Sequence, residues 1–286
     1  MDKPTIIVTG ANGQLGRELQ VLAPAYPAYA FVFADRAELP VDDRQKIDSF
    51  FATHNPSWCI NCAAYTAVDK AEAEKEAAFR INGDGPGYLA AACRSHGAKL
   101  IHISTDYVFD GTSATPLKET DPTGPINTYG ASKLAGEQKA MENNPDGTAI
   151  IRTAWVYSEF GNNFVKTMIR LMKERPAINV VDDQIGSPTY AADLATTILR
   201  IVGGNHFTPG IYHYSNEGRI SWYEFALAIR AQIGSTCTVN PIPSSQYPTP
   251  ARRPYYSLLD KDLIRKTYQV EIPEWETSLT QCLARM

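Results

Sequence analysis

The 286-residue sequence contains little of what marks several common classes of protein. Its five cysteines are odd in number and scattered, at positions 59, 62, 93, 237 and 282, which does not indicate a disulfide framework. Cys59 and Cys62 have the spacing of a redox or zinc pair, but they lie in an expected strand, where residues three apart point to opposite faces. We therefore expect buried structural thiols. The five histidines show no spacing that puts two imidazoles on one helix face, so no metal site is predicted.

Long apolar runs and an excess of positive charge are also missing. No stretch approaches about 18 apolar residues, the length of a membrane-spanning helix, and no signal segment precedes the first expected strand. The formal net charge is -4, whereas non-specific nucleic-acid binding needs a basic surface. We therefore expect a cytoplasmic protein without nucleic-acid or membrane partners.

What the sequence does contain is the pattern of an α/β protein. Its length suits one large α/β unit or two lobes that share a cleft, and its 44% hydrophobic and 20% charged residues are ordinary for a globular chain. Strands are expected at 5–9, 30–34, 58–62, 99–104 and 148–153, and helices at 14–22, 44–54, 77–96 and 129–142. Apolar strands that alternate with helices predict a doubly wound parallel sheet, the Rossmann architecture, which binds ligands at the carboxyl ends of its strands.

The regular alternation loosens after about residue 155. Prolines concentrate between 241 and 254, and aromatic residues between 212 and 225. We therefore predict a dinucleotide-binding domain over residues 1–155 and a smaller C-terminal substrate-binding lobe over residues 156–286. Strands near Ile178–Val181 and Ile211–Tyr214 are expected to return from this lobe to the main sheet.

A glycine-rich loop joins the first expected strand to the first expected helix. Gly10, Gly13 and Gly16 lie three residues apart in this loop. Glycines there allow a tight turn, close approach of the backbone to a pyrophosphate, and close contact between helix and strand. The helix N-terminus then offers free N–H groups to the phosphates. A turn that is merely rich in glycine is the alternative, and it fits this strand–helix junction less well.

Tyr129 and Lys133 lie four residues apart in an expected helix, which places both side chains on one face. A tyrosine with a pKa of about 10 is a poor acid–base group at neutral pH. A lysine ammonium beside it favours the phenolate and prepares the hydroxyl for proton transfer. The spacing alone is common on solvated helices, but together with the glycine loop it predicts a nucleotide-cofactor enzyme.

The residues after the second expected strand bear on the choice of nicotinamide cofactor. An acid in the position of Asp35 usually binds the ribose hydroxyls of adenosine, whereas Arg36 could bind a 2′-phosphate. We expect NADPH, with NADH also open, because these two residues favour different cofactors. Asp42 and Asp43 are expected near the adenine, although Asp43 could instead cap the helix that begins at residue 44.

The two motifs, Gly10-x-x-Gly-x-x-Gly16 and Tyr129-x-x-x-Lys133, together resemble the extended short-chain dehydrogenase/reductase family. Other segments, in order over nearly the whole chain, look like the dTDP-4-dehydrorhamnose reductase branch of that family. They are residues 61–70, 104–111 (Ser-Thr-Asp-Tyr-Val-Phe-Asp-Gly), 152–157, 161–164, 183–189, 221–225 and 249–254. The resemblance is therefore specific to the branch.

The resemblance implies roles for individual residues. It implies that Thr105 hydrogen-bonds the substrate carbonyl, that Tyr129 donates a proton to the developing C4 alkoxide, and that Lys133 binds the nicotinamide ribose and tunes Tyr129. It also implies cofactor contacts from the glycine loop and from the segment after the third strand, namely Gly13, Gln14, Leu15, Ala64, Tyr65 and Thr66.

For the sugar nucleotide, the resemblance implies contacts from Asp106, Tyr107 and Trp155. From the sequence alone, Trp155 could also be a core aromatic that follows a strand. Arg252 and Arg253 suit a nucleotide diphosphate by their charge and donor geometry, although one of them could be a surface arginine.

The resemblance also bears on metal binding and assembly. Dimeric members of the branch can bind magnesium through acidic residues, and Glu18 and Asp193 match two such positions. The C-terminal residues 281–286 offer no carboxylate for the third. We therefore expect no metal, and a monomer or a weak homodimer.

The activity that the resemblance implies is NAD(P)H-dependent reduction of the 4-keto group of dTDP-4-dehydro-L-rhamnose to dTDP-L-rhamnose, in nucleotide-sugar biosynthesis for surface polysaccharide. Another sugar-nucleotide 4-ketoreductase or an epimerase is the alternative enzyme. A dehydratase of this family needs an Asp-Glu pair after the threonine, whereas Thr105 is followed by Asp106 and Tyr107. A non-catalytic, nucleotide-binding regulatory subunit is a third alternative, but it has no need of Thr105, Tyr129 and Lys133 together.

Overall fold

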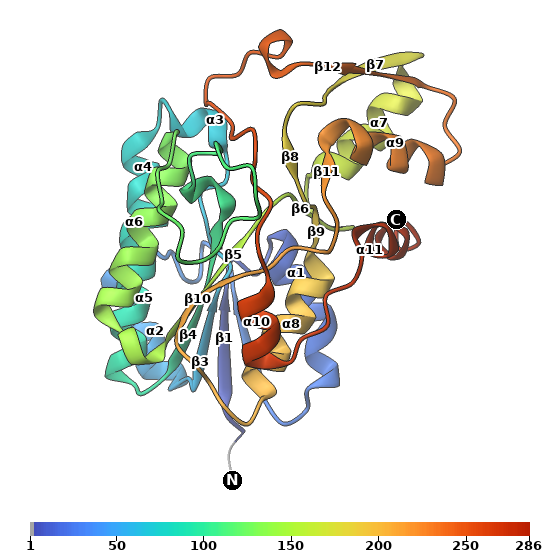
Figure 1. Ribbon diagram of the computed structural model, residues 1–286. Coiled ribbons are helices and arrows are strands. Elements are labelled where there is room, and N and C mark those ends of the chain that lie inside the picture. The colour runs from blue at the N-terminus through green and yellow to red at the C-terminus, as the bar shows by residue number, and fades with distance from the viewer. Residues whose placement is uncertain (1–2) are drawn as a thin grey trace.

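The computed structural model describes residues 3–286 and contains a six-stranded sheet with helices on both faces (Figure 1). The strand order is β10-β5-β4-β3-β1-β2, and all of its pairings are parallel. The strands are β1 (Thr5–Thr9), β2 (Ala30–Ala34), β3 (Trp58–Asn61), β4 (Lys99–Thr105), β5 (Thr148–Thr153) and β10 (Gly210–His213). The predicted doubly wound Rossmann fold is confirmed, with its switch point between β1 and β3.

Alternate residues of each central strand build two separate cores, because successive side chains of a strand point to opposite faces. On one face, Ile6 and Val8 pack with α1 (Gln14–Leu22), α8 (Ala191–Gly203) and α10 (Asp262–Tyr268). On the other face, Ile7 packs with α2 (Arg44–His54), α5 (Gly85–Ser95) and α6 (Thr128–Asn143). The strands are buried on both faces, as their continuous apolar sequences indicate.

The single helix predicted over residues 77–96 is wrong in detail. The segment forms α4 (Lys75–Phe79), a π-helical turn (Arg80–Asp84) and α5. Pro86, in the first turn of α5, has no N–H to continue a regular helical ladder. The wider turn carries Asn82 to the edge of the sheet, where its side chain bonds to the backbone of Tyr65. π-turns of this kind are frequent at functional sites.

A second, smaller core lies in the upper right of Figure 1. It is formed by α7 (Phe164–Glu174), α9 (Trp222–Gln232), α11 (Trp275–Leu283), β7 (Ala177–Val181) and β12 (Thr238–Ile242). Short strands lie between it and the main sheet: β6 (Val156–Tyr157), β8 (Ile185–Gly186), β9 (Thr189–Tyr190) and β11 (Ile220–Ser221). The short helix α3 (Val68–Ala71) follows β3 and packs near α4 and α6.

The two strands predicted to return to the main sheet have different outcomes. The prediction at Ile211–Tyr214 is confirmed, because β10 lies parallel to β5 at the sheet edge. The prediction at Ile178–Val181 is wrong, because β7 pairs with β12 in a two-stranded sheet of its own. In β7 only Ile178 and Val180 are buried, with exposed residues between them. This alternation is typical of a strand with one solvent-facing side.

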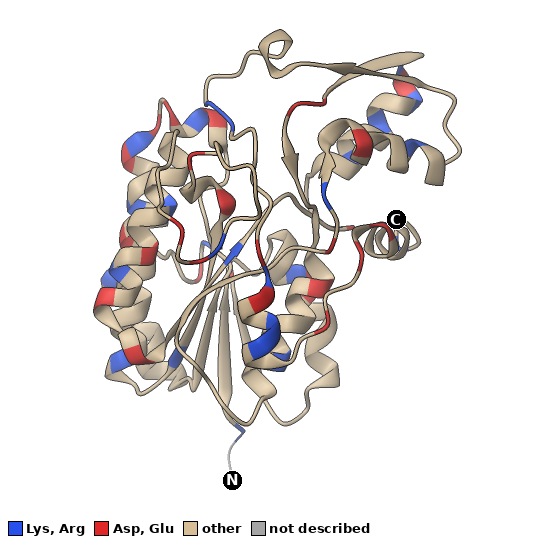
Figure 2. Cartoon of the chain, viewed as in Figure 1, with Lys and Arg blue, Asp and Glu red and all other residues tan. Residues whose placement is uncertain are grey.

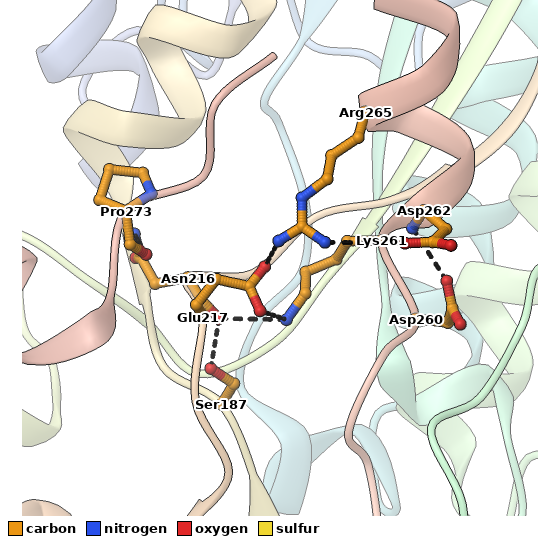
Figure 3. Close-up of polar contacts among 8 residues, drawn as sticks. All are labelled: Ser187, Asn216, Glu217, Asp260, Lys261, Asp262, Arg265 and Pro273. Atoms are coloured by element: carbon orange, nitrogen blue, oxygen red, sulfur yellow. Dashed lines mark hydrogen bonds and ion pairs between the residues drawn. The ribbon is translucent and has the colours of Figure 1, made fainter. Parts of the chain in front are cut away.

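Some of the chain beyond residue 155 packs on the main sheet. Helices α8 and α10 contribute to the first core, and β10 to the sheet itself. The division at residues 155 and 156 therefore remains a prediction about domains. Figure 3 shows one polar cluster that ties this region together: Glu217 forms ion pairs with Lys261 and Arg265, and the Lys261 ammonium also donates to the carbonyl of Asn216 at 3.3 Å.

Charged residues of both signs are interspersed along the outer helices, and the strands of the sheet are almost free of them (Figure 2). Within residues 3–286, no helix is long and apolar enough to cross a membrane.

Candidate active site

A cavity of about 1210 Å³ lies where the strands of the main sheet end. It is lined by Gly10 after β1, Asp35 after β2, Cys62 after β3, Thr105 at the end of β4 and Thr153 at the end of β5. Parallel strands bring their carboxyl ends to one edge, and the reversal of strand order opens a crevice there. The cavity is large enough for two ligands of nucleotide size.

Most of the residues predicted for the site line this cavity. They are Gly10, Gly13, Gln14, Leu15, Asp35, Arg36, Asp42, Ala64, Tyr65, Thr66, Thr105, Asp106, Tyr107, Tyr129, Lys133 and Trp155. Among the described residues, four of those predicted do not line it: Gly16, Asp43, Arg252 and Arg253.

The glycine loop is built so that its backbone reaches the cavity. Gly10 has a φ of +63°, and a Cβ there would lie 2.7 Å from the backbone nitrogen of Ala63. A Cβ on Gly16 would lie 2.5 Å from the carbonyl oxygen of Gly10. The absence of a side chain at Gly16 therefore lets α1 pack closely against the loop. No side chain caps α1, whose N-terminus starts after Gly13, so its first N–H groups face the cavity unpaired by a cap.

Asp35 and Arg36 both line the cavity at the end of β2. The Asp35 carboxylate accepts hydrogen bonds from the Asn12 amide at 3.1 Å and from the backbone N–H of Ala37 at 2.8 Å. These donors hold the carboxylate in place at the cavity wall. Arg36 follows it in the chain and carries a guanidinium of the kind that binds a phosphate.

The two acids that follow have separate places. Asp42 lines the cavity and pairs with Arg80 at 2.7 Å. Asp43 caps α2 by accepting a hydrogen bond from the backbone N–H of Lys46 at 3.1 Å. The cofactor contact predicted for Asp43 is therefore not supported, and the capping alternative describes this residue.

Tyr129 and Thr105 approach each other from α6 and β4. The N-terminus of α6 is held by Asn127, whose side chain accepts from the backbone N–H of Gly130 at 2.8 Å. The Thr105 hydroxyl donates to the Asp106 carboxylate at 2.9 Å. The Tyr107 ring packs edge-on against the Tyr129 ring, with 5.7 Å between centroids. Tyr129 is half-buried and lies against an aromatic neighbour.

Burial raises the pKa of Tyr129 to about 12. The expectation that Lys133 would favour the phenolate is therefore not met in this structure. Lys133 Nζ donates to the carbonyl of Ile103 at 2.6 Å, and burial lowers the lysine pKa to about 8. Tyr129 consequently keeps its proton at neutral pH, which is the state that a proton donor needs.

Two residues that sequence reasoning missed complete the site. Asn82, from the π-turn, holds Tyr65 in place by accepting from its N–H at 2.8 Å and donating to its carbonyl at 3.0 Å. Trp222 lines the cavity and stacks on Trp155, with 3.6 Å between centroids and 12° between planes. The cluster of aromatic residues near position 222 was a signal for Trp222. Asn82 had no such signal, because it lies in a segment that was predicted as one regular helix.

Trp155 itself has an unusual backbone, with a φ of +50°. A bulky residue in this left-handed region is strained and is held there by its surroundings. The turn directs the indole into the cavity, so Trp155 is not a core aromatic. Such outliers concentrate at ligand sites.

The substrate contacts of Arg252 and Arg253 remain a prediction. Both Arg253 terminal nitrogens donate to Asp69, at 3.0 and 2.8 Å, and Asp69 also accepts from the backbone N–H of Ala251. The carbonyl of Arg252 accepts from Asn127, the residue that caps α6. The segment around these arginines therefore links α3 to the N-terminus of α6 through hydrogen bonds.

All five cysteines are free thiols, and Cys59, Cys93, Cys237 and Cys282 are buried as predicted. Cys62 is different, because it is half-buried and lines the cavity. Its position just after β3 is the reason, since strand ends form the cavity wall. Burial raises its pKa, so it is an unreactive thiol at neutral pH.

Glu18 and Asp193, the two acids considered for magnesium, are engaged by protein groups. A Glu18 oxygen accepts from the Ser158 hydroxyl at 2.6 Å, and its other oxygen lies 3.7 Å from Arg285. Asp193 accepts from Asn216 and Ser278. Over residues 3–286, no three His, Cys, Asp or Glu side chains are arranged to hold a metal ion.

A Rossmann sheet, a glycine loop at its switch point, and a Tyr–Lys pair that lines the same cavity as a threonine define a nicotinamide-dependent oxidoreductase of the short-chain dehydrogenase/reductase type. The chain belongs to the family described as the RmlD substrate binding domain, whose model matches residues 4–286.

Similar proteins carry more specific names. A dTDP-4-dehydrorhamnose reductase of Aggregatibacter actinomycetemcomitans is 40% identical over 284 residues, which cover 96% of each chain. A structure of dTDP-4-dehydrorhamnose reductase from Bacillus anthracis, in complex with NADP, is 42% identical with a TM-score of 0.95 and covers 100% of both chains. A dTDP-4-keto-6-deoxy-D-glucose reductase of Streptomyces niveus is 41% identical, and the match covers 96% of this chain and 95% of that one.

Proposed function

We propose that this protein uses NADPH to reduce the 4-keto group of dTDP-4-dehydro-L-rhamnose, giving dTDP-L-rhamnose. Relatives named for this reductase match nearly the whole chain at about 40% identity, and one of them was solved with NADP. The observation in this structure that carries the proposal is the Tyr129 side chain, which retains its proton and lines, together with Thr105 and Lys133, the cavity that the glycine loop also lines.

The cavity suits a dinucleotide. Gly10 and Gly13 present bare backbone where a Cβ would crowd neighbouring backbone atoms, and the start of α1 supplies N–H groups for a pyrophosphate. Asp35 and Arg36 mark the adenosine end, and Arg36 favours a 2′-phosphate. Lys133 reaches the opposite end and would bind the nicotinamide ribose, while Ala64, Tyr65 and Thr66 line the wall between them.

The chemistry divides between cofactor and protein. NADPH, when bound, supplies the hydride. Thr105 would hydrogen-bond the substrate carbonyl and hold it next to Tyr129, which would donate its proton to the oxygen as negative charge develops there. Asp106, Tyr107 and the Trp155–Trp222 stack would hold the sugar, because they line the same end of the cavity.

A second candidate is reduction of a related dTDP-4-keto-6-deoxy sugar with different stereochemistry. The relative from Streptomyces niveus, named for such a substrate, is about as similar to this chain as the dTDP-4-dehydrorhamnose reductases are. The catalytic groups do not separate the two candidates, because both reactions need the same hydride and proton.

For the cell, we propose a cytoplasmic enzyme of nucleotide-sugar and surface-polysaccharide biosynthesis. Its cofactor and sugar nucleotide are metabolites of that compartment. We further propose a monomer or weak homodimer without a bound metal, because Arg285 already supplies a positive charge beside Glu18.

The test is NADPH oxidation by the purified protein with dTDP-4-dehydro-L-rhamnose and, in parallel, with dTDP-4-keto-6-deoxy-D-glucose, followed by analysis of the sugar products. We expect faster turnover of the first substrate, with dTDP-L-rhamnose as product and turnover by Tyr129→Phe reduced about 10²–10⁴-fold. Preference for the second substrate would support the second candidate. Isomerised sugar without NADPH consumption would indicate an epimerase, and no reaction with either would favour a regulatory subunit.

A further inference from the structure

A row of buried polar side chains crosses the sheet directly beneath the cavity. Thr9, Asn61 and His102 lie opposite one another on β1, β3 and β4. They continue the face on which Ile7, Cys59 and Leu100 form the apolar core two residues earlier in each strand. All three polar residues have 0% exposure. Burying a polar group without a hydrogen bond destabilises the folded state, so each group in this row is expected to have a partner.

The hydrogen bonds in the row fix the orientation of the Asn61 amide. Its Oδ1 accepts from the Thr9 hydroxyl at 2.6 Å and from the backbone N–H of Ala63 at 3.2 Å. A backbone N–H can only donate, so the atom facing it must be the amide oxygen. The Asn61 NH₂ group therefore faces His102, 3.0 Å from its Nδ1.

This orientation in turn fixes the state of His102. Nδ1 must accept from the amide, so a neutral imidazole carries its hydrogen on Nε2. Protonation of Nδ1 would set one donor against another, and burial independently lowers the pKa of His102 well below its usual range. His102 Nε2 lies 3.5 Å from Lys133 Nζ. The imidazole thus presents an N–H to the lysine.

Other ionisable groups also face the lysine. From the next turn of α6, the Glu137 carboxylate favours the ammonium, but it is itself bound to Arg152 at 2.7 Å. From the end of β3, Cys62 is a neutral thiol, since burial raises its pKa. Tyr129, one turn earlier on α6, keeps its proton. The remaining polar contact of Nζ is the carbonyl of Ile103.

We propose that His102 is a positioning residue for Lys133: Asn61 holds it as the Nε2–H tautomer, and this N–H favours the neutral amine and sets the pH at which Lys133 loses its proton. The role of this arrangement in catalysis rests on the proposed function. A lysine that titrates near neutral pH can return a proton to Tyr129 after Tyr129 has donated its own. The tautomer itself does not depend on which substrate is reduced.

The direct test is a long-range ¹H–¹⁵N spectrum of the histidine side chains in the unmodified protein, with the His102 signal assigned by its loss in His102→Phe. We expect the neutral Nε2–H pattern throughout the range in which an ordinary histidine titrates. An Nδ1–H pattern or an imidazolium at neutral pH would overturn the proposal.

The effect on Lys133 is tested by replacing the amide with a carboxylate. In Asn61→Asp, Nδ1 must donate, so the Nε2 lone pair faces the ammonium, as in a Ser-His-Asp triad. We expect the pKa of Lys133 to rise by roughly one unit or more, followed in ¹³C-lysine spectra and in the alkaline limb of kcat/KM. Thr9→Val, which removes a hydroxyl from the same row, should keep the Nε2–H pattern and the lysine pKa.

A double variant separates this effect from the added charge alone. If His102 transmits the change, Asn61→Asp should raise the lysine pKa much less in the His102→Phe background than in the unmodified protein. An equal rise in both backgrounds would show that His102 does not act on Lys133. If the keto-sugar is not reduced but the tautomer and lysine titrations are as expected, the proposed function fails and this inference stands.

Discussion

The cofactor side and the substrate side of the cavity are built in different ways. The cofactor side consists of strand ends and helix starts that are next to each other in the sequence, such as Gly10 to Leu15 and Asp35 to Arg36. The substrate side combines Trp155 and Trp222 from short segments far apart in the chain, against a rim braced by Arg253 and Asp69.

This difference explains why local sequence patterns say more about one side of the cavity than about the other. On the cofactor side, a strand followed by a helix fixes where the intervening loop lies, so local patterns are sufficient. On the substrate side, short strands and loops with little regular structure carry the residues. An arginine there can contact either a ligand or an acid on a neighbouring helix, and the local sequence around it does not determine which.

Loss of the Tyr129 hydroxyl should have the largest effect. Tyr129→Phe keeps the buried ring and its contact with Tyr107 but removes the proton donor, so kcat should fall about 10²–10⁴-fold with cofactor affinity retained. Steady-state kinetics and NADPH titration measure the two quantities. More than a tenth of the original kcat in the variant would rule out this role.

Removal of Lys133 should damage both binding and turnover. Lys133→Ala loses a ribose contact and the buried amine together, and we expect kcat/KM to fall by about 10²-fold with a higher KM for NADPH. The matched control is Lys139→Ala on the same helix, where the lysine forms a surface pair with Asp84. Equal losses in both variants would indicate damage to α6 and not to the site.

Glu18 on α1 contacts Ser158 and Arg285 from the C-terminal part of the chain. Its carboxyl group should make the free energy of unfolding depend on pH. Burial and the neighbouring Glu159 raise the pKa of Glu18 from 4.5 to about 7. The folded state therefore favours the protonated acid, a contribution that is complete below pH 4.5 and lost as the pH rises through about 7.

Glu18→Gln should remove this dependence. Relative to the variant, the original protein should lose roughly 1–3 kcal/mol of unfolding free energy across that range. Urea unfolding at a series of pH values measures it. Parallel pH profiles for the two proteins would show that Glu18 does not hold its proton in the folded state.

On the substrate side, the stacked indoles should contribute affinity and little chemistry. Trp222→Ala removes the partner of Trp155, so the KM for the sugar nucleotide should rise about tenfold with the KM for NADPH unchanged. Trp222→Phe, which keeps an aromatic face, should recover most of this loss. A change confined to the cofactor KM would contradict the placement of Trp222 on the substrate side.

The smallest effect is expected at the adenosine end. Arg36→Ala should weaken NADPH use several-fold and leave NADH use unchanged, because the guanidinium can bind a 2′-phosphate that NADH lacks. Asp35→Ala should weaken NADH use selectively. Arg44→Ala, a surface arginine paired with Asp48 on α2, is the control. An unchanged ratio of the two KM values in Arg36→Ala would place Arg36 away from the phosphate.

The sheet, the glycine loop and the Tyr129–Lys133 pair could be predicted from the sequence alone. Continuous apolar strands of about five residues, separated by amphipathic helices, allow few arrangements other than a parallel sheet covered on both faces. The helices predicted at 14–22 and 44–54 have those bounds in the structure. Local periodicity was enough because it reflects contacts that every residue of an element repeats.

The partners of single polar side chains depend on the tertiary fold and could not be predicted. Asp43 caps the N-terminus of α2, and Arg253 pairs with Asp69. Asn82 hydrogen-bonds Tyr65 from a π-turn that no sequence periodicity indicates. The fold also brings His102 beneath Lys133. Each of these contacts joins residues whose separation in the chain carries no information about their distance in space, except for the local cap at Asp43. Their chemistry follows from burial and from neighbours, which the packing of the whole chain determines.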